Sequence, residues 1–161
     1  MTSAGTGPPF QPIRVLFVCT GNSARSQIAE ALLGRIGGED FDVASAGTDP
    51  RGINAYTLRV LAEAGFDWST ARSKSVDEFL DRSFDYVITV CDRARQSCPV
   101  FPGSHESIHW GIDDPAEADG TDDERLAAFR GAYRELARRI RPFVEMALRD
   151  AGRSRPVAVL D

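Results

Sequence analysis

Four short apolar runs along the chain predict buried β-strands. They lie at residues 15–18, 41–46, 86–90 and 107–110. Because parallel strands that are covered on both faces are nearly continuous apolar runs, these segments favour a parallel sheet. Segments with apolar residues at helical spacing separate the runs, and such alternation is typical of a doubly wound α/β fold. We therefore predict a sheet of about four parallel strands with helices on both faces.

Helical spacing of apolar residues predicts four helices, at residues 27–36, 55–62, 76–80 and 126–143. Gly65 follows the second of them as a C-terminal cap. Thr121 and Glu124 form a capping box before the last and longest helix. Pro142 lies near the end of that helix, and we expect it to kink the helix or to end its regular part.

The chain has 161 residues, enough for a single domain with a real core, which we place at residues 13–150. Residues 1–12 are rich in Gly, Pro, Ser and Thr. They lack the basic and apolar regions of a signal peptide, so we predict a disordered tail. Residues 151–161 are expected to form a second tail. No run of 18 apolar residues is present, so no transmembrane helix is predicted.

Composition narrows the range of partners. The net charge is −5, which argues against binding to nucleic acid or to an anionic membrane surface. Three cysteines are an odd number and too few for a disulfide scaffold, and the chain lacks a signal peptide. We expect a cytoplasmic protein, acting as a monomer, whose cysteines are reactive thiols.

The loop between the first predicted strand and helix has the composition of an oxyanion cradle. Such a loop turns backbone N–H groups and a helix N-terminus toward an anion, and it stabilises a thiolate at Cys19. Arg25 can grip two oxygens of the anion with its planar fork, and the Ser26 hydroxyl can donate to the sulfur. A compact buried cysteine before a turn is the structural alternative. The expected oxyanion-binding residues are Thr20, Gly21, Asn22, Ser23, Ala24 and Arg25.

Two further thiols lie near the same edge of the predicted sheet. Cys91 directly follows the third strand, and Cys98 comes seven residues later. This spacing is not a zinc pattern, and no metal or cofactor is predicted. If the segment between them is helical, the thiols are about 10 Å apart, too far for a disulfide unless the segment unwinds. They are either two unrelated cysteines or, beside Cys19, a thiol relay.

Acidic residues follow the last predicted strand. Attack on an oxyanion expels an oxide or hydroxide, and a carboxylic acid poised above the cradle can supply the required proton. Asp113 and Asp114 come before Pro115 at this strand end. They either serve this purpose or belong to an acidic solvated loop. His109, within the strand and next to the core residue Trp110, is interpreted as structural.

These motifs together resemble those of the thioredoxin-coupled arsenate reductases built on the low-molecular-weight tyrosine phosphatase fold. The similarity runs from about residue 15 to residue 140 and rests on VLFVCTGNSARSQIAEALL, VASAGT, VITVC with its later cysteine, and HWGIDDPAE. The resemblance implies reduction of arsenate to arsenite, arsenic detoxification, and regeneration by thioredoxin. It implies that Cys19 attacks arsenate, that Cys91 attacks the adduct, and that Cys98 resolves the resulting disulfide.

The resemblance also assigns the supporting residues. It implies that Arg25 grips the anion, Ser26 supports the thiolate, Asn22 braces the loop, and Asp114 is the general acid. The alternatives are a tyrosine phosphatase and a reductase that uses a small thiol such as mycothiol. Gln27 replaces the proline that phosphatases usually carry, and Ala116 replaces a tyrosine that frames aryl substrates. Both departures favour the reductase, with residual phosphatase activity.

Some relatives have a potassium site close to the loop. The corresponding residues are Asn22, Glu30 and Ser45, with an acidic residue further along the chain. Lys74, the only lysine, occupies that last position here. Because its ammonium group can take the place of the cation, no potassium site is expected.

Overall fold

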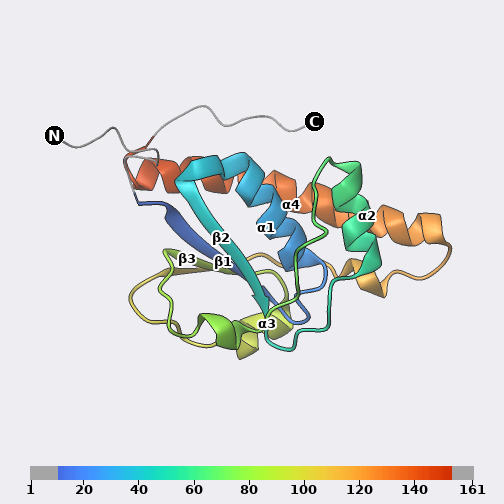
Figure 1. Cartoon of the computed structure of the whole chain (residues 1–161), viewed down its shortest axis with the longest axis horizontal. Helices are drawn as coiled ribbons and strands as arrows, with labels where there is room; N and C mark the ends of the chain where they lie inside the picture. Colours follow the sequence, from blue (N-terminus) through green and yellow to red (C-terminus); the bar gives the residue numbers. More distant parts are fainter. Residues whose placement is uncertain (1–10, 154–161) are drawn as a thin grey trace.

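The computed structural model describes residues 11–153 and contains one four-stranded parallel sheet with strand order β2-β1-β3-β4 (Figure 1). The prediction of a four-stranded parallel α/β fold is confirmed. Strand β1 lies inside the sheet between β2 and β3, and all but one of its residues are buried. The strands are β1 Ile13–Cys19, β2 Phe41–Gly47, β3 Tyr86–Thr89 and β4 Glu106–His109.

The longer helices lie together on one side of the sheet. In Figure 1, α1, α2 and α4 lie on that side, and the short α3 lies at one end of the strands. Three short 3₁₀ turns, Gly38–Asp40, Val76–Phe79 and Pro115–Glu117, join the elements. The helices are α1 Arg25–Gly37, α2 Ala55–Glu63, α3 Asp92–Ser97 and α4 Asp122–Asp150.

Local sequence signals account for the ends of two helices. Thr121 and Glu124 form the predicted capping box at the start of α4. Gly65 has a φ of 85° after α2, and the N–H of Phe66 donates to the carbonyl of Leu61. This is the hydrogen bond of a glycine-terminated helix, in which a residue without Cβ takes the left-handed conformation at little cost.

We expected Pro142 either to kink helix α4 or to end its regular part. The second alternative is wrong. The helix continues to Asp150. Although proline lacks the N–H that would bond to the preceding turn, Phe143, Val144 and Leu148 beyond it are buried in the core. Packing of this apolar face holds the last turns in place.

Two other predicted elements differ in detail. The segment predicted as a third helix is the 3₁₀ turn Val76–Phe79. Strand β4 is not buried on both faces, because it is the edge of the sheet and its first two residues are exposed.

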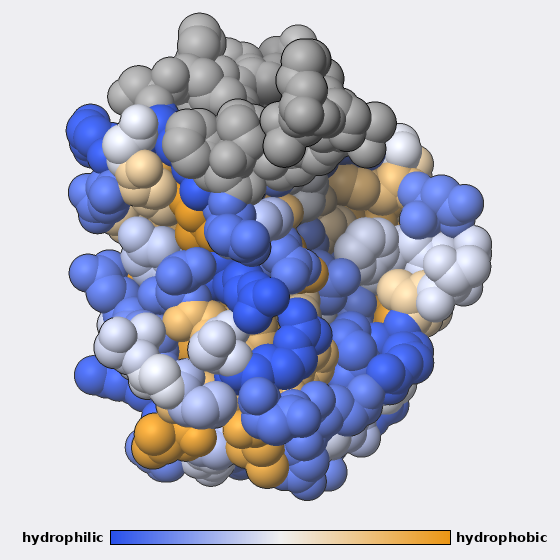
Figure 2. Space-filling model, turned by 60° about the vertical axis from the view of Figure 1, so that its left-hand side comes forward, coloured by the Kyte–Doolittle hydropathy of each residue, from blue (hydrophilic) through white to orange (hydrophobic). Residues whose placement is uncertain are grey.

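The surface in Figure 2 is mostly hydrophilic, with only small hydrophobic patches.

The predicted tails fall mainly outside the described residues, which exclude 1–10 and 154–161. Residues 151–153 are described, and their backbone N–H groups donate to carbonyls in the last turns of α4. No helix within residues 11–153 combines the length and apolar character that crossing a membrane requires.

The topology brings two thiols together. Strands β1 and β3 are parallel neighbours, so their carboxyl ends meet at the same edge of the sheet. Cys19 is the last residue of β1, and Cys91 comes two residues after the end of β3. Ligands of open α/β sheets bind at this edge.

Candidate active site

Cys19 lies at the bottom of the loop that joins β1 to α1. Its side chain is 2% exposed. Its Sγ atom is 2.8 Å from Ser26 Oγ and accepts a hydrogen bond of 3.1 Å from the backbone N–H of Asn22. Donors of this kind stabilise the thiolate, the nucleophilic form of cysteine. The predicted support from Ser26 therefore has the required geometry.

Hydrogen bonds from Asn22 determine which atom donates between Ser26 and Cys19. Its Nδ2 donates to Ser26 Oγ at 2.8 Å and to Ser45 Oγ at 3.0 Å. Each serine therefore keeps its own proton for another acceptor: Ser26 donates to the Cys19 sulfur, and Ser45 donates to Glu30 Oε1 at 2.6 Å. Asn22 is fully buried with a φ of 46°, a backbone conformation that asparagine tolerates better than most residues.

A second loop, residues 48–54, holds the outside of the cradle. Its backbone N–H groups donate to the carbonyl oxygens of Cys19, Thr20, Gly21 and Ser23. With these carbonyls turned outward, the N–H groups of the cradle remain available for an anion. Gly47 permits this close approach, because a Cβ there would lie 2.5 Å from the carbonyl oxygen of Thr20.

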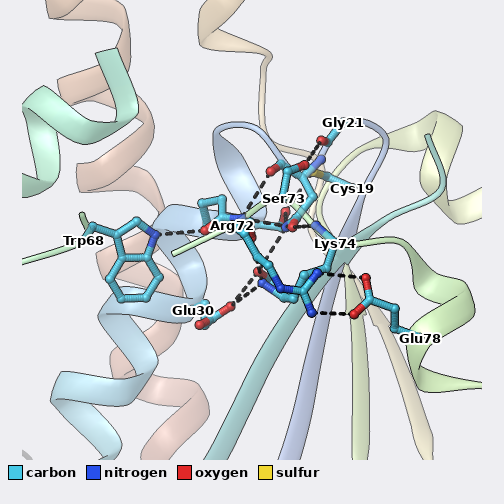
Figure 3. A network of polar contacts seen from close by, with 12 residues as sticks. Cys19, Gly21, Glu30, Trp68, Arg72, Ser73, Lys74 and Glu78 are labelled. Atoms are coloured by element: carbon cyan, nitrogen blue, oxygen red, sulfur yellow. Dashed lines mark hydrogen bonds and ion pairs between the residues drawn. The ribbon is translucent and has the colours of Figure 1, made fainter. Parts of the chain in front are cut away.

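Figure 3 shows a network of polar contacts that links the cradle to the segment of Trp68, Arg72, Ser73 and Lys74. Gln27, fully buried, donates to the Oδ1 of Asn22 at 2.9 Å and to the carbonyl of Arg72 at 3.1 Å. Trp68 donates to the Gln27 side chain at 2.8 Å, and Ser73 donates to the carbonyl of Gly21 at 3.0 Å. Gln27, in the place of the phosphatase proline, thus ties the cradle to residues 68–73.

The ammonium group of Lys74 is near the place considered for potassium. Its Nζ atom is 3.7 Å from Glu30 Oε1 and donates to the carbonyl of Arg72 at 3.1 Å. The backbone N–H of Lys74 also donates to Asn22 Oδ1 at 2.8 Å. A cationic side chain therefore lies beside Glu30 in the network of Asn22 and Ser45.

Arg25 connects the cradle to the acidic loop. Its Nη1 donates to the carbonyl of Ile112 at 3.0 Å, and its Nη2 is 3.5 Å from Asp114 Oδ2. Asp114 Oδ1 accepts from the N–H of Ala116 at 3.0 Å, which fixes the carboxyl group. Asp114 is half-buried, whereas Asp113 is exposed. Of the two acids, Asp114 is therefore the one held close to Arg25.

The cradle opens into a cavity of about 640 Å³. The cavity is much larger than a tetrahedral oxyanion. Its wall includes most of the predicted site residues and two arginines, Arg51 and Arg93, that the sequence did not single out. Among residues 11–153, no three His, Cys, Asp or Glu side chains gather closely enough to hold a metal ion.

Cys91 contacts the cradle loop directly. Its Sγ is 3.4 Å from the Thr20 hydroxyl, and it accepts from the N–H of Ala94 at the start of α3. Cys98 lies at the other end of α3 and is half-buried, and this burial raises the pKa of its thiol above the ordinary value. All three cysteines are free. Helix α3 separates Cys91 from Cys98, and a rise of about 1.5 Å per residue over seven residues corresponds to about 10 Å.

The supporting residues that sequence reasoning missed belong to two segments far from Cys19 along the chain. They are residues 48–54 and residues 68–73. Their contacts to the cradle come from backbone groups and common polar side chains such as Ser73, which carry no motif. Only the fold brings them to the site.

Residues 14–153 match the family described as low molecular weight phosphotyrosine protein phosphatase. The chain belongs to this family. It is 42% identical over 131 residues to an arsenate reductase of Halalkalibacterium halodurans, covering 81% of this chain and 94% of the relative.

Solved structures of family members show the same fold. The crystal structure of arsenate reductase from Archaeoglobus fulgidus superposes with a TM-score of 0.66 and 32% identity, over 81% of this chain and 98% of that one. A thioredoxin-dependent arsenate reductase of Corynebacterium glutamicum gives a TM-score of 0.57 and 36% identity, over 82% of this chain and 64% of that one. The phosphatase-family fold inferred from the motifs is confirmed.

Proposed function

We propose that this protein reduces arsenate to arsenite through a relay of three thiols. The observation that carries the proposal is the contact between Thr20 and Cys91 at 3.4 Å. A phosphatase needs only the nucleophile Cys19, the arginine and the acid. A second free thiol in contact with the cradle loop gives the chain a group that can attack the Cys19 sulfur. The identity to arsenate reductases, 42% over 131 residues, supports the same substrate.

The first step forms a bond between sulfur and arsenic. The cradle N–H groups and Arg25 hold the tetrahedral anion, and the Cys19 thiolate attacks arsenic. Asp114 transfers a proton to the departing oxygen, which leaves as water. Arg25 also contacts Asp114 and the carbonyl of Ile112. An anion bound in the cradle competes with Asp114 for the Arg25 guanidinium group.

The second step reduces arsenic. The Cys91 thiolate attacks the Cys19 sulfur, and a disulfide forms between the two. The electron pair of the sulfur–arsenic bond passes to arsenic, which changes from As(V) to As(III) and leaves as arsenite. Thr20 and the N–H of Ala94 contact the Cys91 sulfur and support its thiolate.

The third step returns the cradle to its starting state. Cys98 attacks the Cys91 sulfur, the bond to Cys19 breaks, and Cys19 leaves as a thiolate. The product is a Cys91–Cys98 disulfide, which requires α3 to unwind. An external dithiol then supplies two electrons and two protons. We assign this role to thioredoxin, because the Corynebacterium glutamicum relative is described as thioredoxin-dependent. We propose a cytoplasmic monomer that detoxifies arsenic.

Hydrolysis of aryl phosphates is the second candidate activity. The cavity of about 640 Å³ can admit a group attached to the anion, and Ala116 leaves that region open. Phosphate and arsenate are both tetrahedral anions, and hydrolysis would use Cys19, Arg25 and Asp114 alone. We propose it as a residual activity of the same site.

The test is turnover of arsenate with thioredoxin, thioredoxin reductase and NADPH, compared with mycothiol and its reductase. Wild type is expected to produce arsenite at many turnovers with thioredoxin. Cys19→Ser should abolish reduction and phosphate hydrolysis together, whereas Cys91→Ser and Cys98→Ser should abolish only multiple-turnover reduction. If Cys98→Ser turns over with mycothiol as fast as wild type does with thioredoxin, a small-thiol mechanism replaces the relay.

A further inference from the structure

His109 bonds to residues on both sides of Cys91. Its Nδ1 is 2.8 Å from the Thr89 hydroxyl at the end of β3, and its Nε2 is 2.8 Å from Asp92 Oδ1 at the start of α3. Thr89 precedes Cys91 by two residues, and Asp92 follows it by one. One imidazole ring on β4 therefore spans the point where the chain turns from β3 into α3.

The partners determine the donors. A carboxylate can only accept, so His109 Nε2 carries a proton and donates to Asp92. In the neutral ring Nδ1 then accepts from the Thr89 hydroxyl. If Nδ1 is also protonated it donates to Thr89 instead, and the hydroxyl can turn toward the Ile108 carbonyl at 3.5 Å. Both bonds of His109 are therefore available in either protonation state.

Helix α3 depends on such contacts. It has six residues, too few for a helix that is stable by itself. Within α3, the buried Ala94 packs in the core, and Asp92 is the one residue whose side chain bonds to another element of the described structure. The Asp92 side chain is 86% exposed, whereas that of His109 is 20% exposed. The strand side of Cys91 is held by a further backbone bond, from the N–H of Trp110 to the carbonyl of Thr89.

We propose that His109 is a positioning residue for the second thiol, holding Cys91 against the cradle through Thr89 and Asp92. The inference rests on the proposed relay, because only the relay uses Cys91. With both flanks fixed to β4, the Cys91 sulfur stays beside Thr20 while residues 93–98 unwind. Cys91 is thus the stationary end of the relay, and Cys98 is the end that moves.

A bond to the sulfur of Cys19 requires near-linear approach by the Cys91 thiolate, so a small displacement of Cys91 slows the second step. Misplacement by about 1 Å can cost up to about 100-fold in rate. The His109–Asp92 pair is exposed on one side and is one of several anchors. Loss of the His109–Asp92 contact should therefore slow the attack of Cys91 on the Cys19 sulfur by about three- to tenfold.

The experiment compares Asp92→Ala with Asp92→Asn. Both variants remove the negative charge from the cavity wall, but asparagine keeps an oxygen that accepts from His109. Wild type and variants are mixed with saturating arsenate in the absence of a reductant. Each protein also carries Cys98→Ser, so that the reaction stops at the Cys19–Cys91 disulfide of the second step, and the rate at which this disulfide forms is followed by acid quench and mass spectrometry. Amide hydrogen exchange of residues 92–98 is measured on the reduced proteins.

Asp92→Ala is expected to form the disulfide three- to tenfold more slowly and to exchange amides faster in α3, with the KM for arsenate not raised. Asp92→Asn should remain within about twofold of wild type in both measurements. His109→Ala should be at least as slow as Asp92→Ala. If His109→Ala fails to fold, Asp92→Ala still tests the inference, because the Asp92 side chain is on the surface.

Three outcomes would overturn the inference. Asp92→Ala could react as fast as wild type, or it could exchange faster in α3 without any loss of rate, which would make the contact purely structural. Asp92→Asn could also be as slow as Asp92→Ala, which would assign the effect to charge. If the protein with Cys98→Ser alone forms no Cys19–Cys91 disulfide with arsenate, the proposed function fails and this inference fails with it.

Discussion

Ser26 Oγ lies 2.8 Å from the Sγ of Cys19 and accepts a hydrogen bond from Asn22, so its own proton is free to be donated to the sulfur. The first helical turn of α1 therefore supports the nucleophile through a side chain, in addition to the loop N–H group of Asn22. This relationship is the basis of the first prediction.

Ser26→Ala should slow the attack of Cys19. A hydrogen bond to a charged group contributes about 1.5–3 kcal/mol, so the rate constant is expected to fall about 10- to 100-fold. Alkylation of Cys19 by iodoacetamide across a range of pH values, resolved by mass spectrometry, measures the loss of thiolate. Ser107→Ala, on the exposed part of β4, is the control. Equal alkylation rates in Ser26→Ala and wild type would show that Ser26 does not support the thiolate.

Asp114→Asn should remove the proton donor while it preserves size. General acid catalysis contributes about 100- to 10,000-fold, and kcat should fall within this range. Asp113→Asn should have a much smaller effect, because Asp113 is exposed and Asp114 is the residue beside Arg25. Steady-state kinetics with arsenate checks the ranking. A larger loss in Asp113→Asn would place the proton donor one residue earlier.

Cys98 should be a poor nucleophile until α3 opens. Burial raises the pKa of its thiol, so less thiolate is present at a given pH than in an exposed cysteine. Alkylation of Cys98 in the reduced protein should therefore rise only at a higher pH than alkylation of the same residue in urea. Peptide mass spectrometry after timed alkylation gives both curves. Coincident curves would mean that the thiol is already exposed in the folded protein.

Lys74→Met should destabilise the fold, because it leaves the partly buried Glu30 without its cation. The expected loss is about 1–3 kcal/mol in the free energy of unfolding, as for a polar group deprived of its partner. Arg138→Met, on an exposed i,i+3 pair of α4, should cost less than about 0.5 kcal/mol. Urea denaturation measures both changes.

The Lys74 interpretation also predicts the response to salt. Wild-type stability should be the same in KCl and in NaCl at equal ionic strength, because an ammonium group already neutralises Glu30. A specific increase in stability with KCl would contradict this interpretation.

Local signals in the sequence were sufficient for the sheet, the cradle and most of the helices. Apolar runs located β1 and β3 because these strands are buried in the sheet, and the capping box at Thr121 marked the start of α4. The end of helix α4 was mispredicted at Pro142, because burial of Phe143 and Val144 beyond it outweighs the local cost of a proline. That packing is tertiary and leaves no local trace.

Cys19 and Cys91 could be predicted because cysteine is rare in this chain and each follows an apolar strand. The choice of Asp114 over Asp113 came from the family resemblance. The brace of the cradle could not be predicted, because Ser73 and residues 48–54 act through ordinary polar groups. The pairing of His109 with Asp92 was also hidden, since it joins residues 17 apart whose elements become neighbours only in the folded sheet.

The relay itself is tested most directly by a single turnover. Reduced protein is mixed with excess arsenate without any external thiol, the reaction is quenched with acid, and arsenite and disulfides are quantified. The relay predicts one arsenite per chain and a Cys91–Cys98 disulfide with Cys19 free, whereas Cys98→Ser should stop at a Cys19–Cys91 disulfide. Absence of arsenite, or arsenite formed with all three thiols still reduced, would contradict the relay.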